Sequence, residues 1–168
     1  LHYRGEAGSI ASYVLEGPGG LVMVETGPGS TTSSLEAGLA KLGHRPEDVG
    51  HVFVTHIHFD HAGAAGWMAA RGARIYVHEF GAKHLIDPSK LLASAQRIYG
   101  DRMEELWGTI EPCPAERVVA VHDGDTFDVA GLTIRAIETP GHARHHHAFA
   151  LDTERLAFVG DAAACAVT

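Results

Sequence analysis

Four side chains of metal-ligand type fall within six consecutive positions of this chain. Residues 55–63 read THIHFDHAG, which places His56, His58, Asp60 and His61 directly after an apolar run. Neutral imidazoles and carboxylates are the ligands that zinc, iron and manganese take in proteins. A lone histidine is more often a solvated or core residue, but four such groups at this spacing predict a metal centre.

The surrounding sequence places these side chains where a strand gives way to a helix. Residues 52–54 form an apolar run, and with Thr55 they are typical of a short buried strand. Residues 62–71 are rich in small side chains and end before a glycine, which is typical of a helix. His56 and His58 are two positions apart in extended chain and so point to one side. The aspartate and the third histidine fall on the turn into the helix and can reach the same space.

Two later loops add ligand-type residues, again at the ends of predicted strands. The sequence TPGH follows a predicted strand at 132–137 and ends at His142. The sequence GDA follows a predicted strand at 156–159 and contains Asp161. Binding sites in sheets of this kind gather in the loops at strand ends. We therefore expect one site built from His56, His58, Asp60, His61, His142 and Asp161.

The rest of the chain predicts alternating strands and helices followed by a mostly β region. Strands are predicted at 9–16, 21–25, 52–55, 74–78, 117–121, 126–129, 132–137, 146–151 and 156–159. Helices are predicted at 33–42, at 62–71 and, with breaks near 87–88 and 100, at 79–106. This order implies mixed sheets with helices on their faces, and the length fits a single domain over residues 1–168.

Composition is that of an ordinary globular protein, with 45% hydrophobic and 20% charged residues. The net charge of −8 disfavours nucleic acid and anionic membrane as partners. No apolar run reaches the roughly 18 residues of a membrane span, and no signal region opens the sequence. The two cysteines, Cys113 and Cys165, argue against a disulfide framework and favour a cytoplasmic location. Cys165 is interpreted as a buried structural thiol.

Taken together, these pieces resemble the metallo-β-lactamase superfamily of metallohydrolases, most nearly its glyoxalase-II-like branch. The matching sequences are ETG at 25–27, THIHFDHAG at 55–63, TPGH at 139–142 and GDA at 160–162, in the family's order. The resemblance covers essentially the whole chain. It implies an α/β fold, the four-layer αβ/βα sandwich, with a dinuclear metal site on one edge.

The resemblance also implies a role for each of the six residues as a ligand of two divalent metal ions. The first ion would be held by His56, His58 and His142, the second by Asp60 and His61, and Asp161 would bridge them. Zinc is the first expectation, and iron and manganese suit the same ligands. A hydroxide between the ions would be the nucleophile, and Asp60 would orient it and pass its proton to the leaving group. An aspartate at 161 argues against a true β-lactamase, because those members lack it.

Two features depart from the family pattern. The usual Asp-Thr-Gly is ETG here, and Glu25 is interpreted as support for a ligand histidine, with a solvated strand end as the alternative. The family's last histidine ligand lies well beyond GDA, whereas the sequence stops at Thr168. We therefore expect the C-terminal part of the second half of the sandwich to be missing, which weakens the second metal site. His145 and His146 are further candidates to support the site or face the substrate.

The leading functional expectation is a metal-dependent hydrolase of an ester, thioester or lactone that acts on a small molecule through a metal-bound hydroxide. An alternative from the same branch is a mononuclear iron dioxygenase of persulfides, with iron on His56, His142 and Asp161. A non-enzymic metal-binding relic or fragment is also open. An unfinished sheet would expose a strand edge that a second copy could cover, which would make the protein a homo-oligomer.

Overall fold

Eleven strands and six α-helices form within residues 1–163, which are the residues that the computed structural model describes. The strands are β1 (His2–Tyr3), β2 (Glu6–Ala7), β3 (Tyr13–Gly17), β4 (Gly20–Val24), β5 (Val49–Phe53), β6 (Arg74–His78), β7 (Val118–Val121), β8 (Thr126–Val129), β9 (Leu132–Glu138), β10 (His147–Leu151) and β11 (Leu156–Phe158). The helices are α1 (Thr32–Lys41), α2 (Phe59–Ala62), α3 (Ala65–Ala70), α4 (Glu79–Ile86), α5 (Ser89–Tyr99) and α6 (Met103–Trp107).

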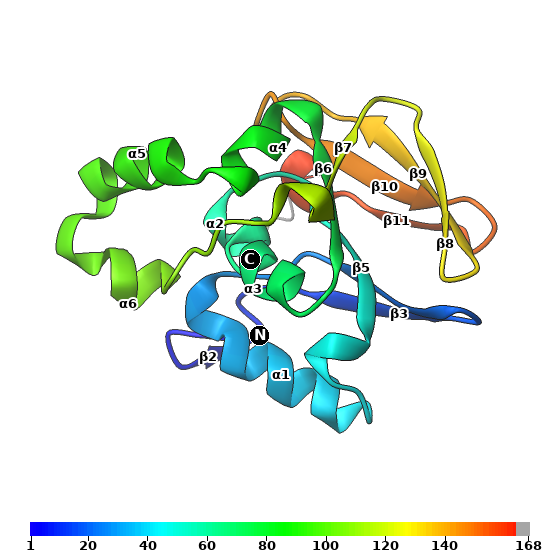
Figure 1. Ribbon diagram of the computed structural model, residues 1–168, viewed down its shortest axis with the longest axis horizontal. Coiled ribbons are helices and arrows are strands. Elements are labelled where there is room, and N and C mark those ends of the chain that lie inside the picture. The colour runs from blue at the N-terminus through cyan, green and yellow to red at the C-terminus, as the bar shows by residue number, and fades with distance from the viewer. Residues whose placement is uncertain (164–168) are drawn as a thin grey trace.

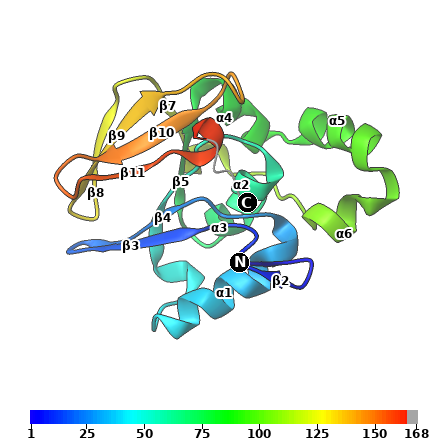
Figure 2. The same cartoon turned by 180° about the vertical axis from the view of Figure 1, so that it is seen from behind.

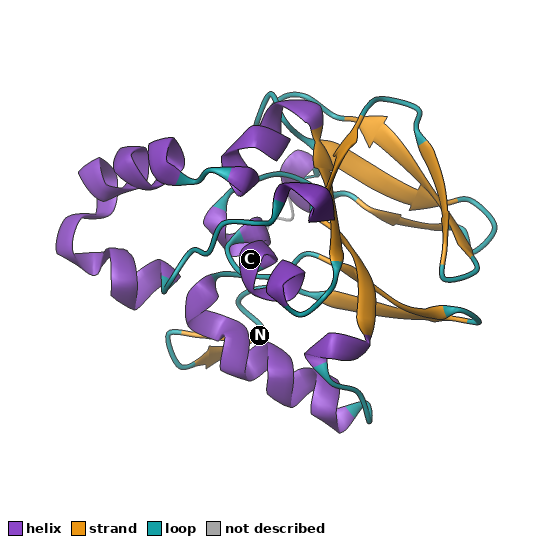
Figure 3. Ribbon diagram, viewed as in Figure 1, coloured by secondary structure: helices purple, strands orange, loops and turns teal. Residues whose placement is uncertain are grey.

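Nine of these strands form two sheets that lie face to face, with helices on the outer face of the first (Figures 1 and 3), and β1 pairs with β2 as a separate hairpin. The first sheet has the order β3-β4-β5-β6-β7, in which β4 to β7 are parallel and β3 is antiparallel. The second sheet is antiparallel, with the order β11-β10-β9-β8. Among residues 1–163 no helix covers the outer face of the second sheet (Figures 1 and 2). Three layers of the expected sandwich are therefore present in the described part of the chain.

Each face of the first sheet has its own hydrophobic core, and β4 shows why. Leu21 and Met23 point toward the helices, whereas Val22 and Val24 point toward the second sheet. All four are buried, as in parallel strands that are covered on both faces. Phe53 of β5 lies between the sheets, where its ring stacks on another aromatic ring. The two cores fix the ends of the parallel strands, from which the ligand-bearing loops leave.

The predicted strands and helices all appear, with shifts at their ends. The predicted helix at 62–71 is instead two short helices, α2 and α3. The break occurs because the backbone N–H of Ala64 donates to Gly27 O (2.9 Å), in the loop after β4, rather than continuing α2. The predicted strand at 9–16 is shorter and later, as β3. The hairpin of β1 and β2 was not predicted, since each strand has only two residues.

None of the helices in residues 1–163 is long and apolar enough to cross a lipid bilayer. Cys113 is buried, and burial raises the pKa of its thiol to about 12. Cys165, which was predicted to be a buried structural thiol, lies outside the described residues.

Candidate metal centre

The ligand-rich stretch leaves β5 in extended conformation and turns into α2 at His58. The His58 backbone is extended (φ −65°, ψ 151°), and its carbonyl accepts the first helical hydrogen bond, from Ala62 N at 2.8 Å. Hydrogen bonds also join α2 to the loop after β4, where the Thr26 N–H and hydroxyl both donate to His61 O (2.8 and 3.0 Å). Asp60 therefore lies within the first turn of a helix whose position is fixed by the adjacent loop.

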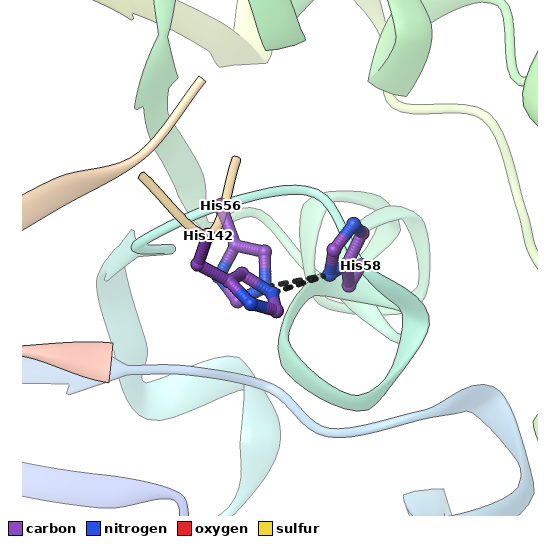
Figure 4. Close-up of side chains that lie close together, drawn as sticks. All are labelled: His56, His58 and His142. Carbon is purple, nitrogen blue, oxygen red and sulfur yellow. Dashed lines mark hydrogen bonds between the residues drawn. The ribbon is translucent and has the colours of Figure 1, made fainter. Parts of the chain in front are cut away.

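Three imidazole nitrogens from two separate loops converge at this turn (Figure 4). His58 Nδ1 lies 3.0 Å from His56 Nε2 and 2.9 Å from His142 Nε2. His56 is fully buried, whereas His58 and His142 are open to solvent on one side. The predicted set for a first metal ion is thus brought together by the fold, although the two loops are 84 residues apart.

A second group of possible ligands lies directly beside the first. His61 Nε2 is 3.3 Å from Asp161 Oδ1 and 3.5 Å from Asp60 Oδ2. The other oxygen of Asp161 is 3.3 Å from His142 Nε2, so this carboxylate lies between the two groups. The donor atoms of His56, His61 and Asp161 also fall within 4.8 Å of one another. All six predicted ligands are therefore neighbours, and their individual roles stay predictions.

Glu25 is buried beneath both groups, so it is not a solvated strand end. Its carboxylate accepts the Thr55 N–H (3.3 Å) and the Thr55 hydroxyl, and lies 3.2 Å from His61 Nδ1. The Thr55 hydroxyl is in turn 3.1 Å from His56 Nδ1. These contacts hold the Nδ1 side of both rings and leave each Nε2 directed at the ligand cluster. Thr55 was not predicted as a site residue, and its position next to His56 was the available signal.

The local electrostatics differ between the histidines. Burial, together with the neighbouring histidines, lowers the pKa of His56, and burial followed by His142 lowers the pKa of His58. Both rings are therefore neutral near pH 7, the form that binds metal. Burial alone would also lower the pKa of His61, but the Glu25 carboxylate, with Asp60 and Asp161, raises it above the ordinary value.

His145 and His146 both lie next to the metal-ligand candidates. The His146 ring is fully buried, 5.0 Å from the His56 ring, and its Nδ1 is 2.7 Å from the Thr139 hydroxyl. Its Nε2 is buried with no hydrogen-bond partner among residues 1–163. The half-buried His145 ring is 5.9 Å from the His58 ring. His146 is thus placed to support the site from beneath, and His145 lies at its side.

A cavity of about 1010 Å³ opens beside these residues. Its polar end includes Asp60, His61, His142 and Asp161. Its apolar walls come from the edges of the two sheets, including Tyr13 of β3 and Leu156 of β11. The polar end is therefore accessible to a small molecule.

The donor chemistry of the site fits divalent metal ions. The nitrogens of His56 and His142 lie 3.0 and 2.9 Å from His58 Nδ1, and all three lie within 4.8 Å of one another, so a cation could bind the lone pairs of the neutral rings together. The carboxylates of Glu25, Asp60 and Asp161 add negative charge around His61. Three nitrogens with adjacent carboxylates suit zinc, iron or manganese, which agrees with the ligand types expected from the sequence.

The sequence matches known proteins over most of its length. The model of the metallo-beta-lactamase superfamily matches residues 5–164. The metallo-beta-lactamase fold-containing protein ST1585 of Sulfurisphaera tokodaii is 32% identical over 117 residues, which cover 67% of this chain and 44% of that protein. The thioesterase pkgB of Emericella nidulans is 28% identical over 140 residues, which cover 83% of this chain and 32% of that protein.

A solved structure shares both fold and sequence. The metallo-beta-lactamase family protein TTHA1429 from Thermus thermophilus superposes with a TM-score of 0.74 at 31% identity, over 89% of this chain and 53% of that one. The chain thus spans about half of the solved relative and less than half of these two curated relatives. The matched sequence, the two facing sheets and the convergent histidines lead to one conclusion: the chain belongs to the metallo-beta-lactamase superfamily.

Proposed function

We propose that this chain carries the metal centre of a hydrolase that cleaves a thioester, ester or lactone of a small molecule. The observation that carries the proposal is the convergence of His56 Nε2 and His142 Nε2 to within 3.0 Å of His58 Nδ1, beside Asp161, at the polar end of an apolar-walled cavity. A relative named as a thioesterase supports the thioester as the first substrate class to test. The aspartate at 161 supports placement in the glyoxalase-II-like branch of the superfamily.

The proposed site holds two divalent ions, zinc first, with iron or manganese as alternatives. His56, His58 and His142 would hold one ion, Asp60 and His61 the other, and Asp161 would contact both. A divalent ion bound there supplies a Lewis acid for the substrate carbonyl and lowers the pKa of a bound water.

The protein's own groups then have separate tasks. Glu25 and Thr55 fix the rings of His61 and His56 through their Nδ1 atoms, so that each ring presents Nε2. The Asp60 and Asp161 side chains are each 41% exposed and border the cavity. Because Asp161 lies between the two groups of ligands, the Asp60 carboxylate is the one that we assign as the base. We expect Asp60 to accept a proton from the attacking water and return it to the leaving group.

The test is turnover by the full-length protein with zinc, iron or manganese supplied, using a generic thioester, a phenyl ester and a lactone. We expect His58→Ala and His142→Ala to lower kcat/KM by at least about 1000-fold, since each removes a ligand of the metal. His44→Ala is the matched control, because His44 lies in the loop between α1 and β5. Loss of metal in the first two variants, measured by elemental analysis, should accompany the loss of rate.

Other results would overturn the proposal. Parental rates in His58→Ala, or no turnover of any of the three substrate types by the metal-loaded protein, would contradict a hydrolase. A single iron per chain, with oxygen uptake on glutathione persulfide, would replace the hydrolase by the dioxygenase.

A further inference from the structure

We infer that three aromatic residues beside the metal centre, Tyr3, Tyr99 and Trp107, form a wall that binds a ring-bearing acyl group of the substrate. We call these three residues the aromatic wall. This inference rests on the proposed hydrolase function and specifies the substrate class of the same site.

The aromatic wall is assembled from distant segments of the chain. Tyr3 lies in β1, Tyr99 is the last residue of α5, and Trp107 is the last residue of α6. The Trp107 ring stacks on Tyr3 (centroids 6.0 Å apart, planes at 25°) and meets Tyr99 edge-on (5.3 Å, 71°). All three side chains are only partly buried, so ring surface remains available to a ligand.

The aromatic wall adjoins the candidate ligands through α2. Phe59, between His58 and Asp60 in the sequence, is buried with its ring 5.8 Å from the Trp107 ring. The aromatic wall therefore contacts the residue that lies between two of the candidate ligands in the sequence.

The position of α6 is fixed by contacts with the rest of the chain. The Ser30 hydroxyl donates to Leu106 O (2.8 Å). A side chain at Gly108 would meet the Ser30 backbone at 2.4 Å, so the glycine permits this close approach. In Figures 1 and 2, α5 and α6 extend from the body of the molecule, and α6 returns toward the hairpin of β1 and β2. The end of α6 is thus fixed against Ser30 and lies near the hairpin of β1 and β2.

The indole nitrogen of Trp107 lacks the hydrogen-bond acceptor that a buried tryptophan usually has. The Trp107 Nε1–H is buried and has no acceptor among residues 1–163. Buried indole N–H groups normally find one. Flat aromatic faces also favour offset-stacked and edge-on contacts with other rings. The partly exposed ring faces fit a planar group better than a short alkyl chain.

The first experiment compares acyl groups on one thiol, using acetyl, benzoyl and naphthoyl thioesters. For Trp107→Leu we expect KM for the naphthoyl thioester to rise roughly tenfold, the loss of an aromatic contact, with kcat nearly unchanged. KM for the acetyl thioester should change by less than about twofold, because that acyl group does not reach the wall. Trp67→Leu is the matched control, since Trp67 packs on the core beneath the helices.

A second measurement does not depend on turnover. The sequence holds two tryptophans, so Trp67→Phe leaves Trp107 as its only indole. A non-hydrolysable naphthoyl thioether should then change the Trp107 fluorescence saturably. It should leave the fluorescence of the Trp107→Phe protein, which retains Trp67, unchanged. Tyr3→Leu, on the short hairpin, should weaken binding in the same direction if Trp107→Leu fails to fold.

The failures of the two proposals are distinguishable. If thioesters are hydrolysed but Trp107→Leu affects acetyl and naphthoyl substrates equally, the aromatic wall is only structural and the hydrolase stands. If the thioether leaves Trp107 fluorescence unchanged, the inference is also wrong. If no thioester is hydrolysed while the thioether still binds at Trp107, the proposed function is wrong and the binding surface stands.

Discussion

At the scale of single residues, the Glu25 carboxylate controls the second group of ligands. It is 4% exposed, with a left-handed backbone (φ 63°) that is unusual for a side chain other than glycine. Its contacts reach His61 directly and His56 through Thr55. A glutamate in place of the family's aspartate therefore still reaches the ring that it was expected to orient.

Glu25→Gln tests this role while keeping the side-chain size. The neutral amide removes the charge that raises the pKa of His61 and weakens its hold on the ring, so we expect affinity for the second ion to fall by about 10–100-fold. Competition with a chromogenic chelator measures the change. Glu36→Gln, on the exposed face of α1, is the control. Equal metal affinity in both variants would contradict the assignment.

His147 predicts a sensitivity to acid that is separate from catalysis. Its ring is fully buried, stacks on His78 at 4.5 Å, and has no partner for either nitrogen among residues 1–163. Burial lowers its pKa to about 4, with nearby Glu138 opposing the shift. The unfolded chain binds the proton near pH 6.5, so the stabilising contribution is present above pH 6.5 and is lost as pH falls toward 4.

The size of this effect is up to about 3 kcal/mol. We expect His147→Phe, which keeps a ring against Phe149, to flatten the fall in unfolding free energy between pH 6.5 and 4. Urea unfolding across that range measures it. The same slope in parent and variant would show that another group titrates.

At the scale of elements, α2 is positioned by close backbone contact. A side chain at Gly63 would meet Phe59 O at 2.5 Å and Pro28 Cα at 2.8 Å, so α2 can approach the loop after β4 only with glycine here. The tight contact places Asp60 and His61 against the other ligands.

Gly63→Ala should therefore lower the unfolding free energy by about 1–3 kcal/mol through overpacking, and weaken metal binding with it. Gly38→Ala is a matched control within α1, where an added Cβ meets nothing within 4 Å. That change should stabilise the protein by up to about 1 kcal/mol. Chemical denaturation of both variants checks the opposite signs, and a loss in both would contradict the argument.

Sequence patterns predicted these elements unevenly. The apolar runs of β4, β5 and β6 were recognised because strands buried on both faces are almost continuously hydrophobic. The division between α2 and α3 was not, because it depends on Ala64 bonding to Gly27, in a loop far earlier in the chain. The six ligand types were apparent from spacing, whereas the contacts of Thr55 and the packing of Phe59 against Trp107 depend on tertiary structure.

At the scale of the whole molecule, the ligand cluster brings negatively charged carboxylates together where the two sheets and the helices meet. Without bound metal, the carboxylates of Asp60 and Asp161 lie beside His61, and Asp161 also lies 3.3 Å from His142, so histidine rings take the place of a cation next to them. Excess chelator should therefore lower the melting temperature by several degrees, since metal that binds only the folded state stabilises it. Calorimetry with and without chelator measures the shift. His142→Ala should show a much smaller shift, and equal shifts would place the metal elsewhere.

In the proposed two-ion site, the shared position of His56 sets the order in which ions can bind. Its Nδ1 faces the Thr55 hydroxyl, which leaves a single nitrogen, Nε2, for coordination, yet this residue belongs to both convergent groups. One lone pair serves one cation, so an ion bound with His58 and His142 takes His56 from the neighbouring group and leaves that group with His61, Asp60 and Asp161. A metal titration should thus show two binding steps of unequal affinity, and the first step should saturate at one ion per chain.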